Sequence, residues 1–536
     1  MKVNNRYRPA YHASVPEAWS NDPNGMIYYK GRVHLFFQHY PHKAEWGPMH
    51  WGHFSTKDFI KWESHPVALI PDQNYEVICG CCSGNAVELD GKLWLMYTAA
   101  QPELQRQCLA WSDDGIHFTK LEDNPVLTAD MLNKEVSPRD FRDPKIFRKD
   151  GYYYCLAGTR IIDPVLFALR AERLKNEEGG INPSNSMPDE VKEIEERDYD
   201  ANPSMGGHYP SQIKVLGGDD RMALGNGNLI LFKSEDLKHW EYCGKLLEKQ
   251  DDLSEEYFTL DGVYECPDYF ESNGMDIILA SPQNLPQMGY RYQNIHSVVY
   301  LTGHLNFETG HFDISGIEDL DSGFDIYASQ AVTMPDGRHI MIAWKEMWDR
   351  IYPTQVDNWV GTYTLPRELE YKKGHLYQSP VREIVSYQKN PVRTERKDIR
   401  DTSISIDGIC GKTIELYAAF DPGDALKTGL KLFKGSKHET LLYYDAEKKV
   451  VVFDRTNSGV TLDKEGEGCR YCAIDQEETI RFRVFLDVCS VEVFINDGRF
   501  TMTSNVYPDP EDIGVEFFSQ GGSAVLIEAE KYDIIV

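Results

Sequence analysis

Ser55-Thr-Lys-Asp58-Phe-Ile-Lys-Trp62, Ser112-Asp-Asp-Gly-Ile-His-Phe118 and Ser234-Glu-Asp-Leu-Lys-His-Trp240 are three copies of one pattern. In each copy a serine is followed by acidic residues and then by an aromatic residue, and an apolar run typical of a β-strand precedes it. Ser112 lies 57 residues after Ser55, and Ser234 lies 122 residues after Ser112. Such internal repetition is typical of architectures in which one small β-sheet recurs, as in β-propellers.

The longer spacing indicates an insertion. Residues 162–222 are rich in Gly, Pro, Asn, Asp and Glu, and only 189–196 has the pattern of a short helix. Without about 60 inserted residues the period is about 60 throughout. Repeats then begin near residues 22, 80, 143, 265 and 326, which predicts an all-β, five-bladed β-propeller over residues 1–370.

The pattern of polar and apolar residues changes after the predicted propeller. Residues 371–398 are expected to be a polar linker with one short amphipathic segment at 380–387. From 399 to 536, alternating runs such as Ile480–Leu486 and Ser490–Ile495 predict short strands. This spacing of strands and turns favours a C-terminal β-sandwich, with one continuous irregular β domain as the alternative.

Composition limits the possible partners. The chain of 536 residues has 56 Lys and Arg against 85 Asp and Glu, a net charge of −29, which makes nucleic acid and membrane surfaces poor partners. The first residues lack the apolar run of a signal peptide, and no later stretch is apolar for long enough to span a bilayer. A cytoplasmic location is therefore expected. Eleven irregularly spaced cysteines predict reduced thiols, and no metal or organic cofactor is predicted.

Three acidic residues occupy matching points of the repeats. Asp22 precedes Ser55 by 33 residues, and Asp143 precedes Ser234 by 91, or about 31 without the insertion. Glu265 precedes a weaker copy at Thr302 by 37 residues. Each acid is followed within two positions by a proline, which removes a backbone donor and favours a strand entrance. Because innermost strands line the channel of a propeller, the three carboxylates are predicted to converge.

Hydrolysis of a glycosidic bond requires at least two carboxyl groups that face each other across that bond. Side chains with flat apolar faces or fixed hydrogen-bonding groups, which suit sugars, surround the three acids in the sequence. They are Trp19, Gln38, Trp46, Trp51, Arg142, Tyr264, Tyr327, Trp344 and Trp348.

Three blocks resemble the signatures of the invertase family, glycoside hydrolase family 32: Trp19-Ser-Asn-Asp-Pro-Asn-Gly25, Phe141-Arg-Asp-Pro144 and Glu265-Cys-Pro267. The similarity covers nearly the whole chain except the insertion. It implies a five-bladed propeller joined to a β-sandwich. It also implies that Asp22 is the nucleophile, Glu265 the general acid and then base, and Asp143 the residue that binds fructose hydroxyls. Retention of configuration follows, with the carboxyls of Asp22 and Glu265 about 5–5.5 Å apart.

The same resemblance suggests contacts to the bound sugar from Asn21, Gln38, Trp46, Cys82, Ser83, Arg142 and Trp344. Cys82 stands where the family usually has an aromatic residue, and Ser20 where it has a larger apolar one. The insertion is expected to join the second and third strands of the third blade on the catalytic side. There it would line one side of the central channel of the propeller or contact a neighbouring subunit. The alternative is a solvent-exposed surface loop.

The expected partner is a small sugar: sucrose, sucrose 6-phosphate or short fructans. The expected reaction is retaining release of terminal β-D-fructofuranosyl units. Lys345 and Arg350 are candidates to bind a substrate phosphate because they follow Trp344. Alternatives are a fructosyltransferase on the same scaffold, an inverting arabinosidase or xylosidase, and a non-catalytic carbohydrate-binding propeller. A homo-oligomer through the sandwich or the insertion is also conceivable from the sequence.

Overall fold

The computed structural model describes residues 6–101, 104–162, 225–248, 262–464, 466–475 and 478–536. The chain is all-β: among these residues, helix is limited to the 3-10 turns η1 (Ala129–Met131), η5 (Pro353–Asp357) and η6 (Arg382–Tyr387). None of the helices in these ranges is long and apolar enough to cross a membrane. The helix predicted at 189–196 and nearly all of the predicted insertion lie outside the described residues.

Five four-stranded antiparallel sheets follow one another along the chain, and the short strand β19 (Trp359–Val360) also joins β1 of the first sheet. In chain order, their strands are β1 (Ala18–Tyr29), β2 (Arg32–Tyr40), β3 (His50–Thr56) and β4 (Trp62–Leu69); β5 (Gly80–Leu89), β6 (Lys92–Gln101), β7 (Leu104–Ser112) and β8 (Thr119–Lys120); β9 (Val136–Lys149), β10 (Tyr152–Ile162), β11 (Gly225–Ser234) and β12 (Glu241–Lys245); β13 (Tyr264–Ser272), β14 (Met275–Pro282), β15 (Val299–Leu305) and β16 (Phe312–Asp319); and β17 (Tyr327–Thr333), β18 (His339–Trp344), β20 (Arg367–Lys372) and β21 (His375–Pro380).

The repeated sequence pattern forms the same turn in the first three sheets, between the third and fourth strands. Asp58 Oδ1 accepts hydrogen bonds from the backbone N–H groups of Ile60 and Lys61 at 3.0 and 2.9 Å. Asp114 and Asp236 accept the corresponding pairs of bonds in the second and third sheets. An aspartate that bonds to its own backbone two residues on is a strong turn former, which explains why this residue marks the repeat.

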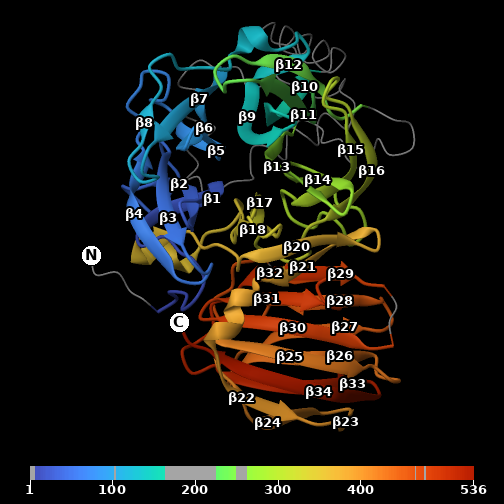
Figure 1. The fold of residues 1–536 in the computed structure, drawn as a ribbon. Coiled ribbons are helices and arrows are strands. Elements are labelled where there is room, and N and C mark those ends of the chain that lie inside the picture. Colours follow the sequence, from blue (N-terminus) through green and yellow to red (C-terminus); the bar gives the residue numbers. More distant parts are fainter. Residues whose placement is uncertain (1–5, 102–103, 163–224, 249–261, 465, 476–477) are drawn as a thin grey trace, which may run out of the picture.

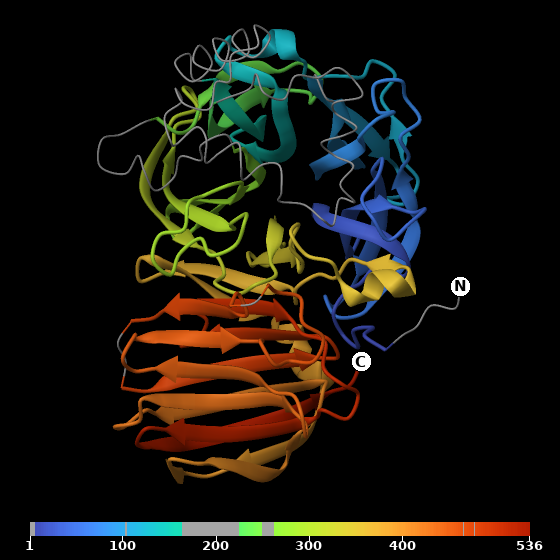
Figure 2. The same ribbon diagram turned by 180° about the vertical axis from the view of Figure 1, so that it is seen from behind.

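The first strands of the five sheets form a closed ring. β1 contacts β5, β5 contacts β9, β9 contacts β13, β13 contacts β17, and β17 returns to β1. Figure 1 shows this ring above a separate stack of strands, and Figure 2 shows the same arrangement from behind. The first strand of every sheet therefore lies at the centre of the ring.

The stack consists of two sheets that enclose their own hydrophobic core, from Ile399 to Ala529. One sheet has the order β22-β34-β25-β30-β31-β32 with β23 beside β34, and the other has the order β24-β33-β26-β27-β28-β29. The strands are β22 (Gln388–Thr394), β23 (Lys397–Arg400), β24 (Ser403–Cys410), β25 (Ile414–Asp421), β26 (Lys427–Lys434), β27 (Thr440–Asp445), β28 (Val450–Asp454), β29 (Cys469–Ala473), β30 (Ile480–Asp487), β31 (Ser490–Ile495), β32 (Phe500–Asn505), β33 (Gly514–Gln520) and β34 (Ser523–Ile534).

The stretch 371–398 is more structured than a linker. Residues 375–380 form β21, the outer strand of the fifth sheet, and η6 and β22 follow. The sequence suggested a linker here because the outer strand of a sheet buries fewer side chains and so carries more polar residues. All eleven cysteines are free, as predicted.

A buried ionic cluster joins the ring to the stack. Arg367 on β20 pairs with Asp321 Oδ2 at 3.0 Å and with Glu492 Oε2 on β31 at 2.6 Å, and all three side chains are fully buried. His12 lies between Glu492 and Asp487, with 2.8 Å from each ring nitrogen to a carboxylate oxygen. These contacts fix the position of one region against the other.

Candidate active site

Each of the five inner strands has a break in its pairing register. The breaks leave Asp22, Ser83, Asp143, Cys266 and Ala328 outside the regular ladder. Asp143 has φ 60°, Cys266 φ 46° and Ala328 φ 53°, so three of these residues are in the left-handed region. A β-bulge re-aims a side chain, which explains how residues of the inner strands turn into the centre of the ring.

Asp22 on β1 is held by neutral donors. Its Oδ2 atom accepts hydrogen bonds from Ser83 Oγ at 2.6 Å, Gln38 Nε2 at 2.7 Å and Cys266 Sγ at 3.4 Å. Its Oδ1 atom accepts one bond, from Asn21 Nδ2 at 3.0 Å. Burial raises the pKa of Asp22, the bonds from Ser83 and Asn21 oppose this, and the charge of Glu265 adds to it.

Asp143 on β9 lies beside Asp22. Its Oδ2 atom accepts hydrogen bonds from Cys266 N at 3.0 Å and from Cys266 Sγ at 3.7 Å, so one thiol contacts both aspartates. The Asp143 backbone N–H donates to Thr98 Oγ1 at 3.0 Å. Burial and the charge of Glu265 raise the pKa of Asp143 to about 7, although Arg142 opposes this shift.

Glu265 on β13 is the more accessible acid. Glu265 is partly buried, with 17% of its side chain exposed, whereas Asp22 and Asp143 are buried. Arg142 donates to its Oε1 atom from Nε at 3.0 Å and from Nη2 at 2.9 Å. The Tyr327 hydroxyl lies 2.5 Å from its Oε2 atom. Both carboxylate oxygens are therefore held in place at the outer side of the cluster.

The structure brings most of the predicted sugar contacts to these acids. Asn21, Gln38 and Ser83 bond to Asp22, and Arg142 bonds to Glu265. Cys82 is partly buried next to Ser83, and its thiol points to the Cys79 carbonyl oxygen at 3.7 Å.

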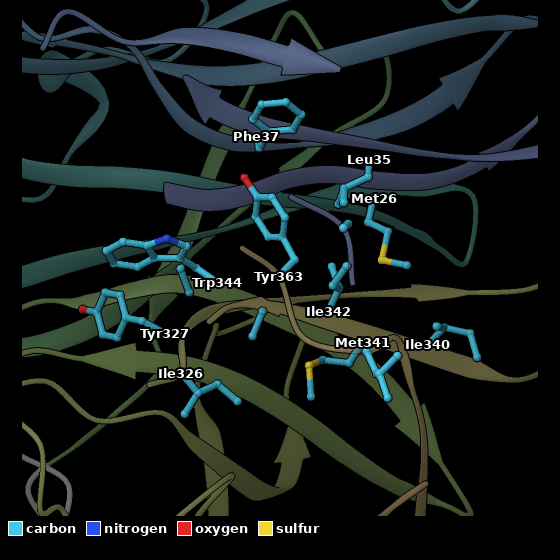
Figure 3. Packing of buried hydrophobic residues seen from close by; sticks show 14 of the residues in the cluster. Met26, Leu35, Phe37, Ile326, Tyr327, Ile340, Met341, Ile342, Trp344 and Tyr363 are labelled. Carbon is cyan, nitrogen blue, oxygen red and sulfur yellow. The ribbon is translucent and has the colours of Figure 1, made fainter. Parts of the chain in front are cut away.

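The predicted tryptophans lie at different depths. Trp46 is partly exposed and packs against the core of the ring. Trp344 differs from the prediction because its side chain is fully buried. It packs against Trp19 and Trp348 with ring centroids 6.1 and 4.9 Å away, and Figure 3 shows it next to Tyr327. Trp344 thus supports the site from behind, because the strand that carries it turns its face into the core.

Sequence reasoning missed two groups at the cluster. Cys266 was quoted only as part of a motif, yet its thiol and backbone N–H contact the aspartates. Thr98 supports Asp143 from β6, and nothing in its local sequence distinguishes it from other strand threonines. Only the pairing of distant strands reveals such a residue.

A possible metal group lies elsewhere. Among the described residues, His438, Asp509 and Asp512 bring ligand atoms within 4.8 Å of one another in the stacked sheets. Arg6 already pairs with Asp509 at 2.8 Å, and His438 Nδ1 lies 3.3 Å from Asp512 Oδ2. These side chains satisfy one another, which accounts for the cluster without an ion.

A hollow of about 570 Å³ lies away from the three acids, where the fifth sheet meets the stack. Its charged side chains pair with each other: Arg338 contacts Glu368 at 3.0 Å, and Arg382 contacts Glu368 at 2.7 Å. Paired surface charges of this kind are ordinary stabilising contacts. The acid cluster at the centre of the ring is therefore the candidate active site.

Three acids from three inner strands, Asp22, Asp143 and Glu265, thus gather at the centre of the ring, and glycoside hydrolases commonly work with such carboxylate pairs. Family models agree. The N-terminal domain model of glycosyl hydrolases family 32 matches residues 12–167 and 208–380, and the C-terminal model of that family matches 382–533. The chain therefore belongs to glycosyl hydrolase family 32. The gap in the first match falls within the predicted insertion.

Individual relatives are similar along their whole length. A sucrose-6-phosphate hydrolase of Zymomonas mobilis is 30% identical over 552 residues, which cover 99% of this chain and 93% of the relative. A raffinose invertase of Escherichia coli is 31% identical, with 98% and 94% covered. The solved sucrose-6-phosphate hydrolase from Lactobacillus gasseri is 26% identical with a TM-score of 0.78, and covers 99% of this chain and 94% of its own.

Proposed function

We propose that this chain is a retaining β-fructofuranosidase that releases terminal β-D-fructofuranosyl units from sucrose, sucrose 6-phosphate or short fructo-oligosaccharides. The observation that carries the proposal is the contact of the Cys266 thiol with both Asp22 and Asp143, with Glu265 one residue away in the chain. Three carboxylates from three different inner strands thus meet at one place. Relatives named sucrose-6-phosphate hydrolase and invertase support the substrate class.

Asp22 is the proposed nucleophile. Three donors hold its Oδ2 atom and one holds Oδ1, so Oδ1 keeps more of its lone-pair density. Oδ1 is the oxygen that would attack C2 of the fructosyl unit. The bond from C2 to the leaving oxygen breaks as that oxygen takes the proton of Glu265, and a fructosyl ester of Asp22 results.

Glu265 then acts as the base. It takes a proton from the water that attacks C2, the ester bond to Asp22 breaks, and fructose leaves with its configuration retained. The Tyr327 hydroxyl has two acceptors in reach, Glu265 Oε2 at 2.5 Å and the Ser281 carbonyl oxygen at 3.0 Å. Because it carries one proton, it can donate to an ionised Glu265 and turn to Ser281 when Glu265 is protonated.

Asp143 is proposed to bind the fructosyl hydroxyls. The hydrogen bonds to its carboxylate from the described residues both involve Oδ2, which leaves Oδ1 as the oxygen proposed to accept hydrogen bonds from the sugar. A carboxylate there accepts hydrogen bonds from sugar hydroxyls and stabilises positive charge that develops on the ring in the transition state.

We also propose the finer architecture. The ring of five sheets would be a five-bladed β-propeller that extends to Pro380, and the stack from Gln388 would be a β-sandwich. The insertion would follow β10 at the side of the ring where β9 begins. Its role as a wall of the funnel stays a prediction, and deletion of residues 165–220 followed by relative rates on sucrose and long fructans tests it.

The test of the proposed function is the release of reducing sugar from sucrose by the wild type and by Asp22→Asn. Activity in the wild type alone is expected. Incubation in methanol tests retention, because a retaining enzyme transfers the fructosyl unit to give methyl β-fructofuranoside. An α-product, or equal activity in the variant, would overturn the proposal.

A further inference from the structure

The residue before Asn21 and Asp22 departs from the family pattern, since Ser20 stands where a larger apolar side chain is usual. Ser20 is fully buried, and it is the last residue of β1 that pairs with β2 before the register break. Pairing resumes at Pro23, so Asn21 and Asp22 lie in the bulge, where the ladder does not fix the chain. The position of the Asp22 carboxylate therefore depends on other contacts.

Tyr363, in the segment between β18 and β20, supplies such a contact. Its hydroxyl lies 3.1 Å from the Asn21 carbonyl oxygen and 2.9 Å from Ser20 Oγ. A hydroxyl has one proton and two lone pairs, so Tyr363 can donate to Asn21 while it accepts a bond from Ser20. Its ring is fully buried and packs against Phe37, with ring centroids 5.8 Å apart (Figure 3). Burial raises the pKa of Tyr363 well above its ordinary value, so the hydroxyl keeps its proton.

The small side chain of Ser20 makes this contact possible. A Cβ atom on Gly361 would lie 1.9 Å from Ser20 Oγ, so the backbone two residues before Tyr363 lies directly against Ser20. The Gly361 N–H donates to Glu346 Oε1 at 3.1 Å, which holds this backbone in place from the other side. A larger side chain at position 20 would push the segment away from the bulge, and the Tyr363 hydroxyl with it.

Asn21 connects this contact to the proposed nucleophile. Its Nδ2 atom donates at 3.0 Å to Asp22 Oδ1, the oxygen proposed to attack C2. Trp19 is fully buried, and its Nε1 atom donates to Asn21 Oδ1 at 2.8 Å, which fixes the end of the amide that faces Asp22. Trp19 thus holds the side chain of Asn21, and Tyr363 holds its backbone carbonyl group.

We propose that Tyr363 is a positioning residue for the nucleophile, which acts through the Asn21 carbonyl group, and that Ser20 aims its hydroxyl. This inference rests on the proposed function. A nucleophile must meet the carbon that it attacks at the right distance and angle, so a small displacement of its carboxylate slows the chemical step. The bond from Tyr363 fixes the peptide that carries Asp22, and its loss should therefore affect kcat more than the binding of the fructosyl unit.

The experiment measures kcat on sucrose and the inhibition constant of fructose in the wild type, Tyr363→Phe and Ser20→Ala. In Tyr363→Phe, kcat should fall about tenfold, as expected for the loss of one hydrogen bond, while the inhibition constant stays within about twofold. Ser20→Ala should lower kcat about threefold, because the Tyr363 hydroxyl keeps Asn21 as an acceptor but loses its second partner. Similar losses are expected on an aryl β-fructofuranoside, because Asp22 attacks C2 of both substrates.

Tyr352→Phe is the matched control. Tyr352 is also fully buried between β18 and β20, but its hydroxyl accepts a hydrogen bond from the Met347 N–H at 2.6 Å. Its loss should leave kcat within about twofold of the wild type. An unchanged kcat in a folded Tyr363→Phe or Ser20→Ala variant, or fructose inhibition that weakens as much as kcat falls, would overturn the role of Tyr363 while sucrose hydrolysis stands. If the wild type does not hydrolyse sucrose, the proposed function itself fails.

Discussion

Two groups of acids are buried in this molecule, and they differ in what faces them. At the centre of the ring, Asp22 and Asp143 accept hydrogen bonds from amides, a hydroxyl and a thiol. At the junction with the stack, Glu492 and Asp321 share the fully buried cation Arg367. Acidic side chains are thus buried in both places, but neutral donors face them in the ring and an arginine faces them at the junction.

The difference appears in the pKa values. Burial would raise the pKa of Glu492, but Arg367 and His12 lower it to about 2. Burial and a like charge raise the pKa of Asp143 to about 7. Loss of one partner from a buried ion pair destabilises the native structure, whereas a buried acid with a raised pKa is a candidate for a functional group.

The largest expected effect comes from substitution of the proposed nucleophile, Asp22. Asp22→Asn keeps the shape of the side chain and removes its charge, so kcat should fall about 10⁴-fold or more. Because Asp22 has no cationic partner in the part of the chain that the structure describes, the free energy of unfolding should stay equal or rise. Urea unfolding and sucrose hydrolysis measure both quantities.

Asp268→Asn is the matched control for stability. Asp268 is buried like Asp22 but pairs with Lys145 at 2.9 Å. The control should lose stability because it leaves a buried ammonium group uncompensated. If Asp22→Asn unfolds more easily than Asp268→Asn, the contrast between the two kinds of buried acid is wrong.

At the junction, the free energy of unfolding should depend most on the cation, Arg367. Arg367→Met leaves buried Asp321 without its cation and Glu492 with His12 alone, and should lower the free energy of unfolding by about 3–5 kcal/mol. Arg382→Met removes an arginine that also pairs with a glutamate, but its side chain is 65% exposed, and about 1 kcal/mol or less is expected. Equal losses in the two variants would show that burial is not what matters here.

The comparison also explains what the sequence could predict. The acids of the ring were found because each one opens a repeat, and the repeat is visible through turn residues such as Asp58 and Asp114. Hydrophobic alternation likewise revealed β30 and β31. The turn residues and the hydrophobic alternation each involve residues that are close in the sequence, so a single sequence is enough to detect them.

Contacts between distant segments could not be predicted in this way. Lys345 was assigned to the substrate side because it follows Trp344, but it turns to Ser490, 145 residues later. Trp344 appeared suited to a sugar, and whether an aromatic ring faces a ligand or the core depends on neighbouring strands. The two partners of Arg367 at the junction, Asp321 and Glu492, are likewise remote from it in sequence.

The pH dependence of stability should differ between wild type and Asp143→Asn. The folded state keeps the proton of Asp143 up to about pH 7, whereas the unfolded chain releases it near its ordinary value of 3.8. The contribution of Asp143 to the free energy of unfolding therefore falls as pH rises from about 4 to 7, by up to about 1.4 kcal/mol per pH unit. Urea unfolding from pH 4.5 to 7.5 should show the stability of Asp143→Asn relative to wild type growing across this window. A constant difference would mean that Asp143 is ionised throughout.

The smallest effect concerns Tyr327, a positioning residue that acts through Glu265. Tyr327→Phe removes the hydroxyl at 2.5 Å from Glu265 Oε2, and kcat/KM on sucrose should fall about threefold to tenfold. Since the hydroxyl assists proton transfer to the leaving oxygen, an aryl β-fructofuranoside with a good leaving group should be affected less. Tyr300→Phe is the control, because its hydroxyl also bonds to a glutamate, Glu318 Oε2 at 2.7 Å, away from the three acids. An equal loss on both substrates would contradict this role. Tyr327 would then act through its packing, because it belongs to the buried hydrophobic cluster of the ring.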